Sequence, residues 1–135
     1  MARVGSYAKI NPPLRQGSDQ EALWEALADG TLTAVTTDHS PFTRAEKERA
    51  KTDIWAAPPG APGVEELLLG MLDAVSKGRV TLEQAVSLVS TNGAKRFGLY
   101  PRKGAVLPGS DADLVLVDLN AETTIRKEDL QTEAR

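Results

Sequence analysis

The apolar residues of the chain recur with helical spacing in one set of segments and form β-branched runs in another. The first helix is predicted over residues 18–29, where Ser18–Glu21 has the form of a capping box and Gly30 closes the segment. Its apolar positions follow the helical period: Leu23, Trp24, Leu27 and Ala28. The next run, Thr31–Thr37, is rich in β-branched residues and ends before the turn signal Ser40–Pro41. The pattern therefore predicts a helix followed by a buried parallel strand.

Two further helices are predicted in the middle of the chain, after a connector. Ala56–Gly63 contains too much proline and glycine to continue a helix or a strand, so a loop is expected there. From Val64, apolar residues at helical spacing continue to Lys77, and Gly78 ends that helix. Thr81–Gln84 is a second capping-box candidate, and it predicts that another helix begins at once.

The last third of the chain changes from helical to extended character. A short helix is expected over Asn92–Gly98, with Phe97 packed inward. Strands are expected at Ala105–Leu107 and Leu114–Leu119, on either side of the turn-forming residues Pro108–Asp111. Helices and strands in this order predict an α/β fold.

Composition and charge narrow the class of protein. The 135 residues are 41% hydrophobic and 26% charged, with a net charge of −3, which is typical of a soluble globular chain. The acidic balance and the scattered lysines and arginines argue against a nucleic-acid partner. The mildly basic stretch Arg44–Lys51 is interpreted as a solvated helical face. No apolar run reaches the roughly 18 residues of a membrane span, and the lack of cysteine fits a cytoplasmic protein.

The candidate chemistry lies at the end of the predicted strand. Asp38 and His39, the only histidine of the chain, follow Thr37 directly. In α/β folds ligands gather beyond the carboxyl ends of the strands, which is where a metal-binding acid belongs. The alternative is that Asp38 caps the next segment and His39 is a surface or packing residue. The local pattern leaves both interpretations open.

Five sequence words extend the argument, because they occur in one order and at characteristic separations. They are Lys9–Arg15, Thr37–Phe42, Pro62–Glu65, Ser90–Gly104 and Gly109–Asp118. In this order they resemble the C-terminal part of a cyclic amidohydrolase, in the group of dihydroorotases, allantoinases and hydantoinases. The resemblance covers nearly the whole chain.

This resemblance implies a metal-dependent (β/α)8 barrel with a small β-sandwich, and hydrolysis of the ring amide of a cyclic ureide or imide. A complete barrel takes about 250 residues, so a chain of 135 residues is expected to hold only part of it. Residues 1–103 are assigned to the C-terminal portion of the barrel and residues 104–126 to an incomplete sandwich. Residues 127–135 are assigned to a polar tail.

The resemblance also assigns roles to the candidate residues. In this family the metal ligands include a His-x-His pair, a modified lysine and further histidines, together with an aspartate that matches Asp38. Asp38 is therefore assigned as metal ligand and general base, and His39 as a residue that supports the loop by a hydrogen bond. A catalytic zinc site needs three protein ligands. The parent enzyme is expected to use a divalent metal, zinc by preference, whereas this chain alone is expected to bind none tightly and to be inactive.

Substrate contacts are assigned to Asn11, Gly60, Ala61 and Gly63, with simple loop punctuation as the alternative. Phe42 stands where dihydroorotases commonly carry a histidine, which weakens that substrate choice. The other words point partly to dihydroorotase or allantoinase and partly to hydantoinase. The substrate is therefore assigned only as a small cyclic amide.

Two functions follow from the sequence. In the first, the chain is part of a cyclic amidohydrolase and depends on its missing N-terminal half or on a second copy of itself. In the second, it is a free-standing binding or assembly module derived from such an enzyme. Segments 31–37 and 114–119 keep their apolar faces, and this favours the first interpretation, because a free-standing module would replace exposed apolar residues by polar ones.

Overall fold

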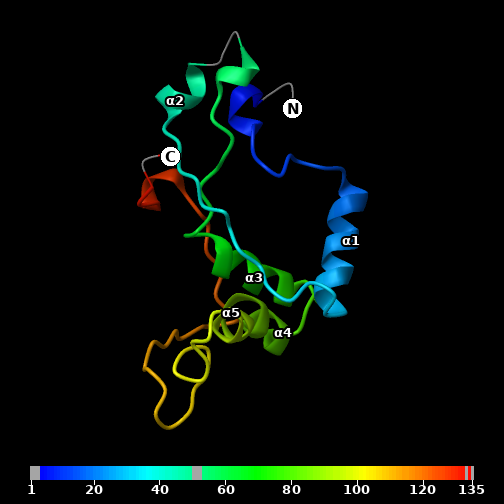
Figure 1. The fold of residues 1–135 in the computed structure, drawn as a ribbon, viewed down its shortest axis with the longest axis vertical. Coiled ribbons are helices and arrows are strands. Elements are labelled where there is room, and N and C mark those ends of the chain that lie inside the picture. Colours follow the sequence, from blue (N-terminus) through cyan, green and yellow to red (C-terminus); the bar gives the residue numbers. More distant parts are fainter. Residues whose placement is uncertain (1–3, 50–52, 133, 135) are drawn as a thin grey trace. The chain divides into compact units, whose positions relative to one another are not determined.

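The computed structural model describes residues 4–49, 53–132 and 134 (Figure 1). The chain divides into two units, which are described separately. The first contains residues 1–16, 37–67 and 123–135, and the second contains residues 17–36 and 68–122.

The second unit is helical, and its first helix is the one that the apolar spacing predicts, but Ser18 lies inside this helix and not at its N-cap. α1 spans Gly17–Ala28 and none of its residues is buried. The chain leaves it through Gly30, whose φ of +83° requires a residue without a Cβ. Leu32 then donates a backbone hydrogen bond of 2.8 Å to the carbonyl of Ala26, which closes the turn. The predicted helix and its glycine stop are both confirmed.

α3 and α4 supply half of the buried apolar side chains of this unit. α3 spans Leu67–Ser76, three residues shorter at its start than the apolar pattern predicts, and Gly78 follows it with a φ of +68°. α4 spans Leu82–Val86, and its predicted capping box is confirmed: the Thr81 hydroxyl accepts from the Gln84 amide. The core of the unit is small and consists of Met71, Ala74, Val80, Ala85, Leu88 and Ala94.

The helix that begins at α4 continues without a break. A π-helical stretch, η3 over Ser87–Thr91, leads directly into α5 over Asn92–Arg96. The short helix predicted from residue 92 is therefore the end of a longer one. The inward packing of Phe97 is wrong, because this residue is the C-cap of α5 and its side chain is 79% exposed. α5 ends before it, and no described element covers its ring.

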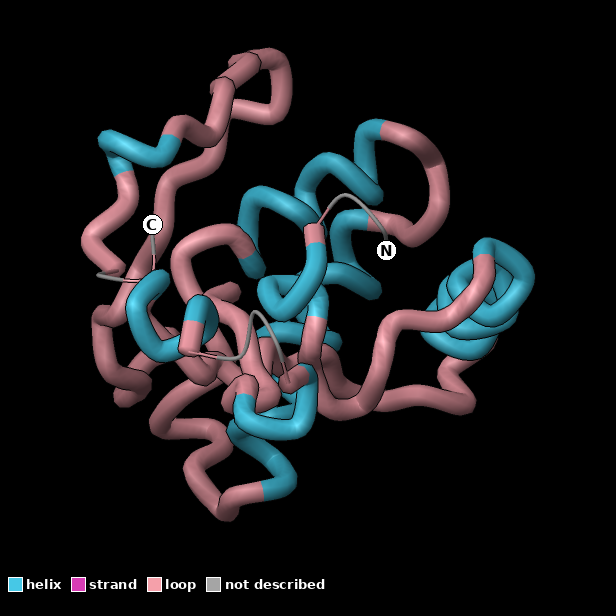
Figure 2. Tube along the Cα trace, turned by 90° about the horizontal axis from the view of Figure 1, so that it is seen from above, coloured by secondary structure: helices cyan, strands magenta, loops and turns pink. Residues whose placement is uncertain are grey.

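The strand predictions are wrong for this structure, since no strand occurs among the described residues (Figure 2). Residues 31–37 run without regular secondary structure beside the helix, where Val35 donates to the Leu88 carbonyl at 3.1 Å and Asn92 donates to the Thr33 carbonyl at 2.8 Å. A strand is defined by a ladder to a neighbouring strand. A helix offers only isolated contacts of this kind, so most of the side chains expected to be buried stay exposed.

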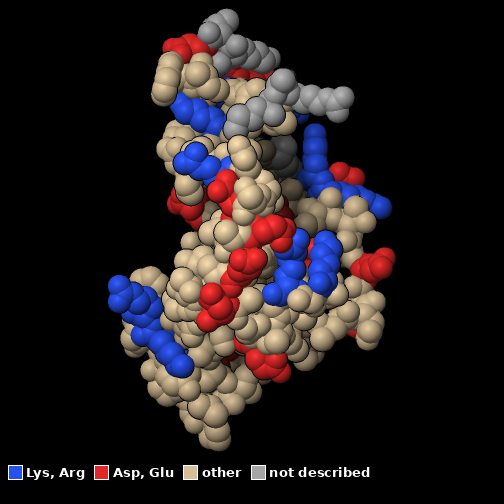
Figure 3. All heavy atoms as spheres, turned by 90° about the vertical axis from the view of Figure 1, so that its right-hand side faces the viewer, with Lys and Arg blue, Asp and Glu red and all other residues tan. Residues whose placement is uncertain are grey.

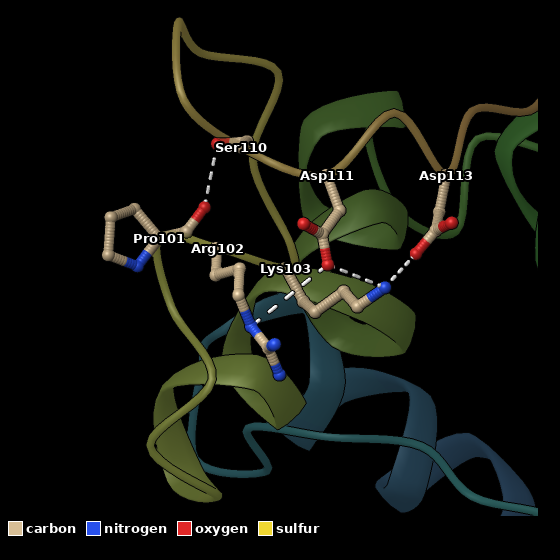
Figure 4. Close-up of polar contacts among 6 residues, drawn as sticks. All are labelled: Pro101, Arg102, Lys103, Ser110, Asp111 and Asp113. Atoms are coloured by element: carbon tan, nitrogen blue, oxygen red, sulfur yellow. Dashed lines mark hydrogen bonds and ion pairs between the residues drawn. The ribbon is translucent and has the colours of Figure 1, made fainter.

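The same reason applies to the predicted strands at residues 105–107 and 114–119, which form no ladder. The turn between them is confirmed: Ser110 donates to the Leu107 carbonyl at 3.0 Å, and Gly109 has a φ of +90°. The loop is instead held at its base by polar side chains (Figure 4). There Lys103 contacts the carboxylates of Asp111 and Asp113.

The first unit contains short elements joined by long loops. They are η1 over Gly5–Ala8, α2 over Arg44–Glu48, η2 over Ile54–Ala56 and η4 over Lys127–Asp129. The loop that the proline and glycine pattern predicts after residue 56 is confirmed. The polar C-terminal segment is attached to this unit through Glu65, whose carboxylate accepts from the backbone amides of Gln131 and Thr132.

Candidate functional site

The Asp38 turn is the centre of the candidate site in the first unit. Asp38 is exposed and has a φ of +46°, in the left-handed region. That conformation costs about 1 to 3 kcal/mol for a residue other than glycine and is often kept at functional sites. The Ser40 hydroxyl donates to the Asp38 carbonyl at 3.1 Å. The carboxylate does not cap the next helix, because the N-cap of α2 is Thr43.

His39 connects this turn to the glycine-containing loop. Its Nδ1 accepts two backbone hydrogen bonds, at 3.1 Å from Gly63 and at 3.2 Å from Val64. A nitrogen that accepts from N–H groups carries no proton, so the neutral ring holds its proton on Nε2. The predicted supporting hydrogen bond of His39 is present, and its Nδ1 is occupied.

Residues 60–64 form the other wall of this site and pack closely against it. The Ser40 amide donates to the Ala61 carbonyl at 3.0 Å. A Cβ on Gly60 would lie 2.5 Å from the Ser40 Cβ and 2.8 Å from the Phe42 ring. A Cβ on Gly63 would lie 3.3 Å from the Thr37 Cβ. Three of the predicted contact residues, Gly60, Ala61 and Gly63, therefore lie against the Asp38 turn.

The segment that contains Asn11 is joined to the same loop through a neighbouring residue. The Lys9 carbonyl accepts from the Gly60 amide at 3.1 Å and from the Lys47 amine at 2.8 Å. Asn11 itself is exposed two residues further on. The structure brings this segment to the loop, and whether Asn11 contacts a substrate stays a prediction.

Lys47 is a residue of this region that the sequence interpretation missed. It was assigned to a solvated face, but its side chain is only 4% exposed. The amine donates to the Pro58 carbonyl at 2.9 Å, as well as to Lys9, and lies 5.7 Å from the centre of the Phe42 ring. Burial lowers its pKa, and the charge of Lys9 lowers it further. A helix of five residues is too short to show an amphipathic period, so no sequence signal marked this lysine. Lys51, the end of the assigned face, lies outside the described residues.

The residues of this unit do not fit a metal site by themselves. Over the described ranges, no three His, Cys, Asp or Glu side chains come together as a group that could hold a metal ion. Asp38 brings one carboxylate, and the Nδ1 of His39 is engaged by the loop. A catalytic zinc needs three protein ligands, so one carboxylate is insufficient.

A cavity of about 370 Å³ lies within the second unit, and its lining includes none of the predicted site residues. It is formed by the end of α1, the turn after it and the helix that begins at α4.

Charged side chains of both signs are interspersed on the face shown in Figure 3. None of the described helices is long and apolar enough to cross a membrane.

Comparison with known proteins gives one family. The model of the amidohydrolase family matches residues 4–134. A D-hydantoinase of Rhizobium radiobacter is 46% identical over 124 residues, which are 91% of this chain and 27% of that protein. A dihydroorotase of Halobacterium salinarum is 46% identical over 129 residues, or 96% of this chain and 30% of that protein. The chain thus spans less than a third of the length of these relatives.

Solved structures give the same result. A D-hydantoinase structure matches 95% of this chain and 28% of its own with a TM-score of 0.92 and 40% identity. The L-hydantoinase of Arthrobacter aurescens matches 91% of this chain and 28% of its own with a TM-score of 0.83 and 39% identity. The fold of this chain is therefore similar to that of a segment of these hydantoinases.

Proposed function

The chain belongs to the amidohydrolase family, and from that premise we propose that it contributes the acid–base carboxylate, Asp38, to an enzyme that hydrolyses the ring amide of a cyclic ureide or imide. The observation that carries the proposal is the geometry of Asp38. Its carboxylate is exposed on a turn in the left-handed region, and a loop of small residues lies directly against that turn. A proton-transfer group must reach its substrate, and small residues let a ring approach the backbone.

Ring opening needs one group near the substrate ring that first accepts a proton and then donates it. Asp38 takes a proton from the water that attacks the ring carbonyl, and a tetrahedral intermediate forms. The carbon–nitrogen bond then breaks, and the Asp38 carboxyl delivers that proton to the leaving nitrogen. One water is consumed, and the ring opens to a new carboxylic acid and a free amide or amine nitrogen. Asp38 ends in its starting state.

We propose that the other residues of the catalytic centre lie in parts of the enzyme that this chain does not contain. The family is generally metal-dependent, but the described residues do not supply a ligand set. We assign residues 1–103 to the C-terminal portion of the family barrel and residues 104–126 to part of its β-sandwich. The remaining ligands come from the part of the enzyme that the matched relatives have in addition to this segment.

The substrate is a small ring, and Phe42 favours one without a carboxylate. Its ring lies against Gly60 of the loop over residues 60–64, so this wall of the site is apolar. A carboxylate on the substrate would need a cationic partner there, while the nearby Lys47 amine is already bound to two carbonyls. Hydantoin-type rings therefore fit this wall better than dihydroorotate.

A grafted enzyme tests the proposal. Residues 4–134 replace the matching segment of the Rhizobium radiobacter D-hydantoinase, and ring opening of hydantoin, allantoin and dihydroorotate is measured. We expect turnover of hydantoin, and a loss of about 10² to 10⁴ in kcat for Asp38→Asn, the usual contribution of acid–base catalysis. Asp118→Asn is the matched control, because its exposed side chain keeps an oxygen for the Asn120 amide.

A folded graft without activity would contradict the proposal and favour a free-standing binding module. Full activity of Asp38→Asn would reject the role of this carboxylate. Preference for dihydroorotate over hydantoin would contradict the assignment of Phe42.

A further inference from the structure

The Asp38 turn is fixed on one side by a single imidazole. His39 accepts at one atom, Nδ1, from the amides of two consecutive residues, Gly63 and Val64. Two backbone donors that converge on one acceptor fix both the ring and the loop that carries the donors. The ring is therefore part of the connection between the turn and the loop.

The contacts around it join the same two segments. The Ser40 amide donates to the Ala61 carbonyl at 3.0 Å, so the residues on the C-terminal side of Asp38 hold loop residues 61, 63 and 64. On the N-terminal side, Gly63 approaches Thr37 so closely that an added Cβ would lie 3.3 Å from the Thr37 Cβ. The loop thus touches the chain on both sides of Asp38.

Asp38 needs such support because its backbone lies in the left-handed region, with a φ of +46°. A residue with a Cβ keeps this conformation only where its surroundings impose it. Apart from Ser40, whose hydroxyl bonds the Asp38 carbonyl, the anchor nearest to Asp38 is the side chain of the next residue, His39. Loss of that anchor would free the turn to relax.

We infer that His39 is a positioning residue: by accepting from Gly63 and Val64 it holds the Asp38 carboxylate and loop 60–64 in one fixed geometry. It acts through the backbone and does not touch the reacting atoms. The inference deepens the proposed function and rests on it for the meaning of that geometry. The hydrogen bonds themselves are tested without any activity.

Three variants of His39 differ in whether they keep a hydrogen-bond acceptor at the position of Nδ1. Asparagine places its side-chain oxygen near the position of the imidazole Nδ1, so His39→Asn keeps an acceptor for the two amides. Glutamine places its amide near the position of Nε2, and alanine has no acceptor. The expected order of loop protection is wild type, then Asn, then Gln and Ala together.

The experiment measures amide hydrogen exchange of Gly63 and Val64 by NMR on the full 135-residue chain and its His39 variants. Removing two hydrogen bonds should speed exchange of both amides by roughly tenfold in His39→Ala, and His39→Asn should recover most of the protection. The Ala85 amide, bonded to Thr81 in the other unit, is the control for folding and should not change.

Two spectroscopic signals separate positioning from simple support. The sequence has one histidine, so a single pair of ring nitrogen signals is expected, with Nδ1 unprotonated. The three-bond amide coupling and Cα shift of Asp38 report its φ. They should change in His39→Ala and return towards wild type in His39→Asn. A loop that only needed general packing would leave the φ of Asp38 unchanged.

Unprotected amides of Gly63 and Val64 in the wild-type chain would overturn the inference, as would equal exchange in wild type and His39→Ala with Ala85 protected. In the grafted enzyme, His39→Ala should lower kcat and His39→Asn should restore it. An inactive graft would reject the proposed function while the exchange data still decide the role of His39.

Discussion

Gly60 is buried at a position that leaves no space for a side chain. Its amide donates to the Lys9 carbonyl, and an added Cβ would meet both Ser40 and Phe42. The nearer atom, the Ser40 Cβ, is attached directly to the backbone and moves only with it. The close approach of loop and turn therefore depends on this glycine.

We predict that Gly60→Ala destabilises the first unit by about 1 to 3 kcal/mol, the usual cost of overpacking. Urea unfolding followed by the fluorescence of Trp55 measures it in a Trp24→Phe background, because each unit carries one tryptophan. Gly93→Ala is the control: it lies in α5 with nothing within 4 Å, and should stabilise that helix by up to about 1 kcal/mol. Equal unfolding midpoints for Gly60→Ala and the parent would disprove the close packing.

At the scale of elements, ion pairs join the two ends of the loop over residues 102–113. Lys103 lies 2.9 Å from Asp111 and also contacts Asp113, while Arg102 is 4.0 Å from Asp111 (Figure 4). The hydrogen bond from Lys103 lowers the pKa of Asp111 most, and the charges of Lys103 and Arg102 lower it further. The backbone of Asp111 also donates to the Arg102 carbonyl at 2.8 Å.

The lowered pKa fixes the sign of a pH effect on this loop. A carboxyl whose pKa is lower in the folded state stabilises it above the ordinary pKa of aspartate, and the contribution is lost as the pH falls through the lowered value. We therefore expect the Asp111 amide to lose protection only in acid below the ordinary aspartate range, as measured by amide exchange corrected for the intrinsic rate.

Lys103→Met should move the carboxyl titration of Asp111 upward, as followed by its carboxyl carbon signal. Lys77→Met removes the lysine partner of a different aspartate, Asp73, and should leave Asp111 unchanged. An unchanged titration in Lys103→Met would mean that the contacts at the base of the loop do not form in solution.

At the scale of the whole molecule, the chain leaves an apolar run without a partner. Leu114, Val115 and Leu116 are 62%, 70% and 100% exposed, and no strand among the described residues pairs with them. Exposed β-prone runs of this kind favour association with another chain. The burial that this segment lacks can be recovered from a second copy.

We expect the isolated chain to self-associate, and the double variant Val115→Lys with Leu116→Lys to shift it towards the monomer. Light scattering during size-exclusion chromatography measures the mass over a range of concentrations. Leu23→Lys is the control, because Leu23 is also an exposed apolar residue but lies on α1. This variant should retain the parent mass. A monomeric parent chain would contradict this prediction.

Helices α1, α3 and α4 and the glycines that follow α1 and α3 were determined by the sequence alone, because they depend on residues within one turn of each other. The Thr81 capping box and the glycines at positions 30 and 78 lie where their local chemistry requires them. The five sequence words likewise led to the family that the comparisons find. The assignment of Asp38 and of the loop residues as functional groups stays a prediction.

Only the tertiary structure decided which segments find partners. Residues 31–37 have strand composition but pair with no strand among the described residues, and no described element covers the apolar ring of Phe97. Lys47 has a charged side chain that is buried because two carbonyls distant in sequence meet its amine. The two bonds to His39 likewise come from residues 24 and 25 positions away. Strand pairing, burial and hydrogen bonds of this kind depend on residues that are distant in sequence and become neighbours only in the folded chain. The composition of a segment shows only that it is able to form them.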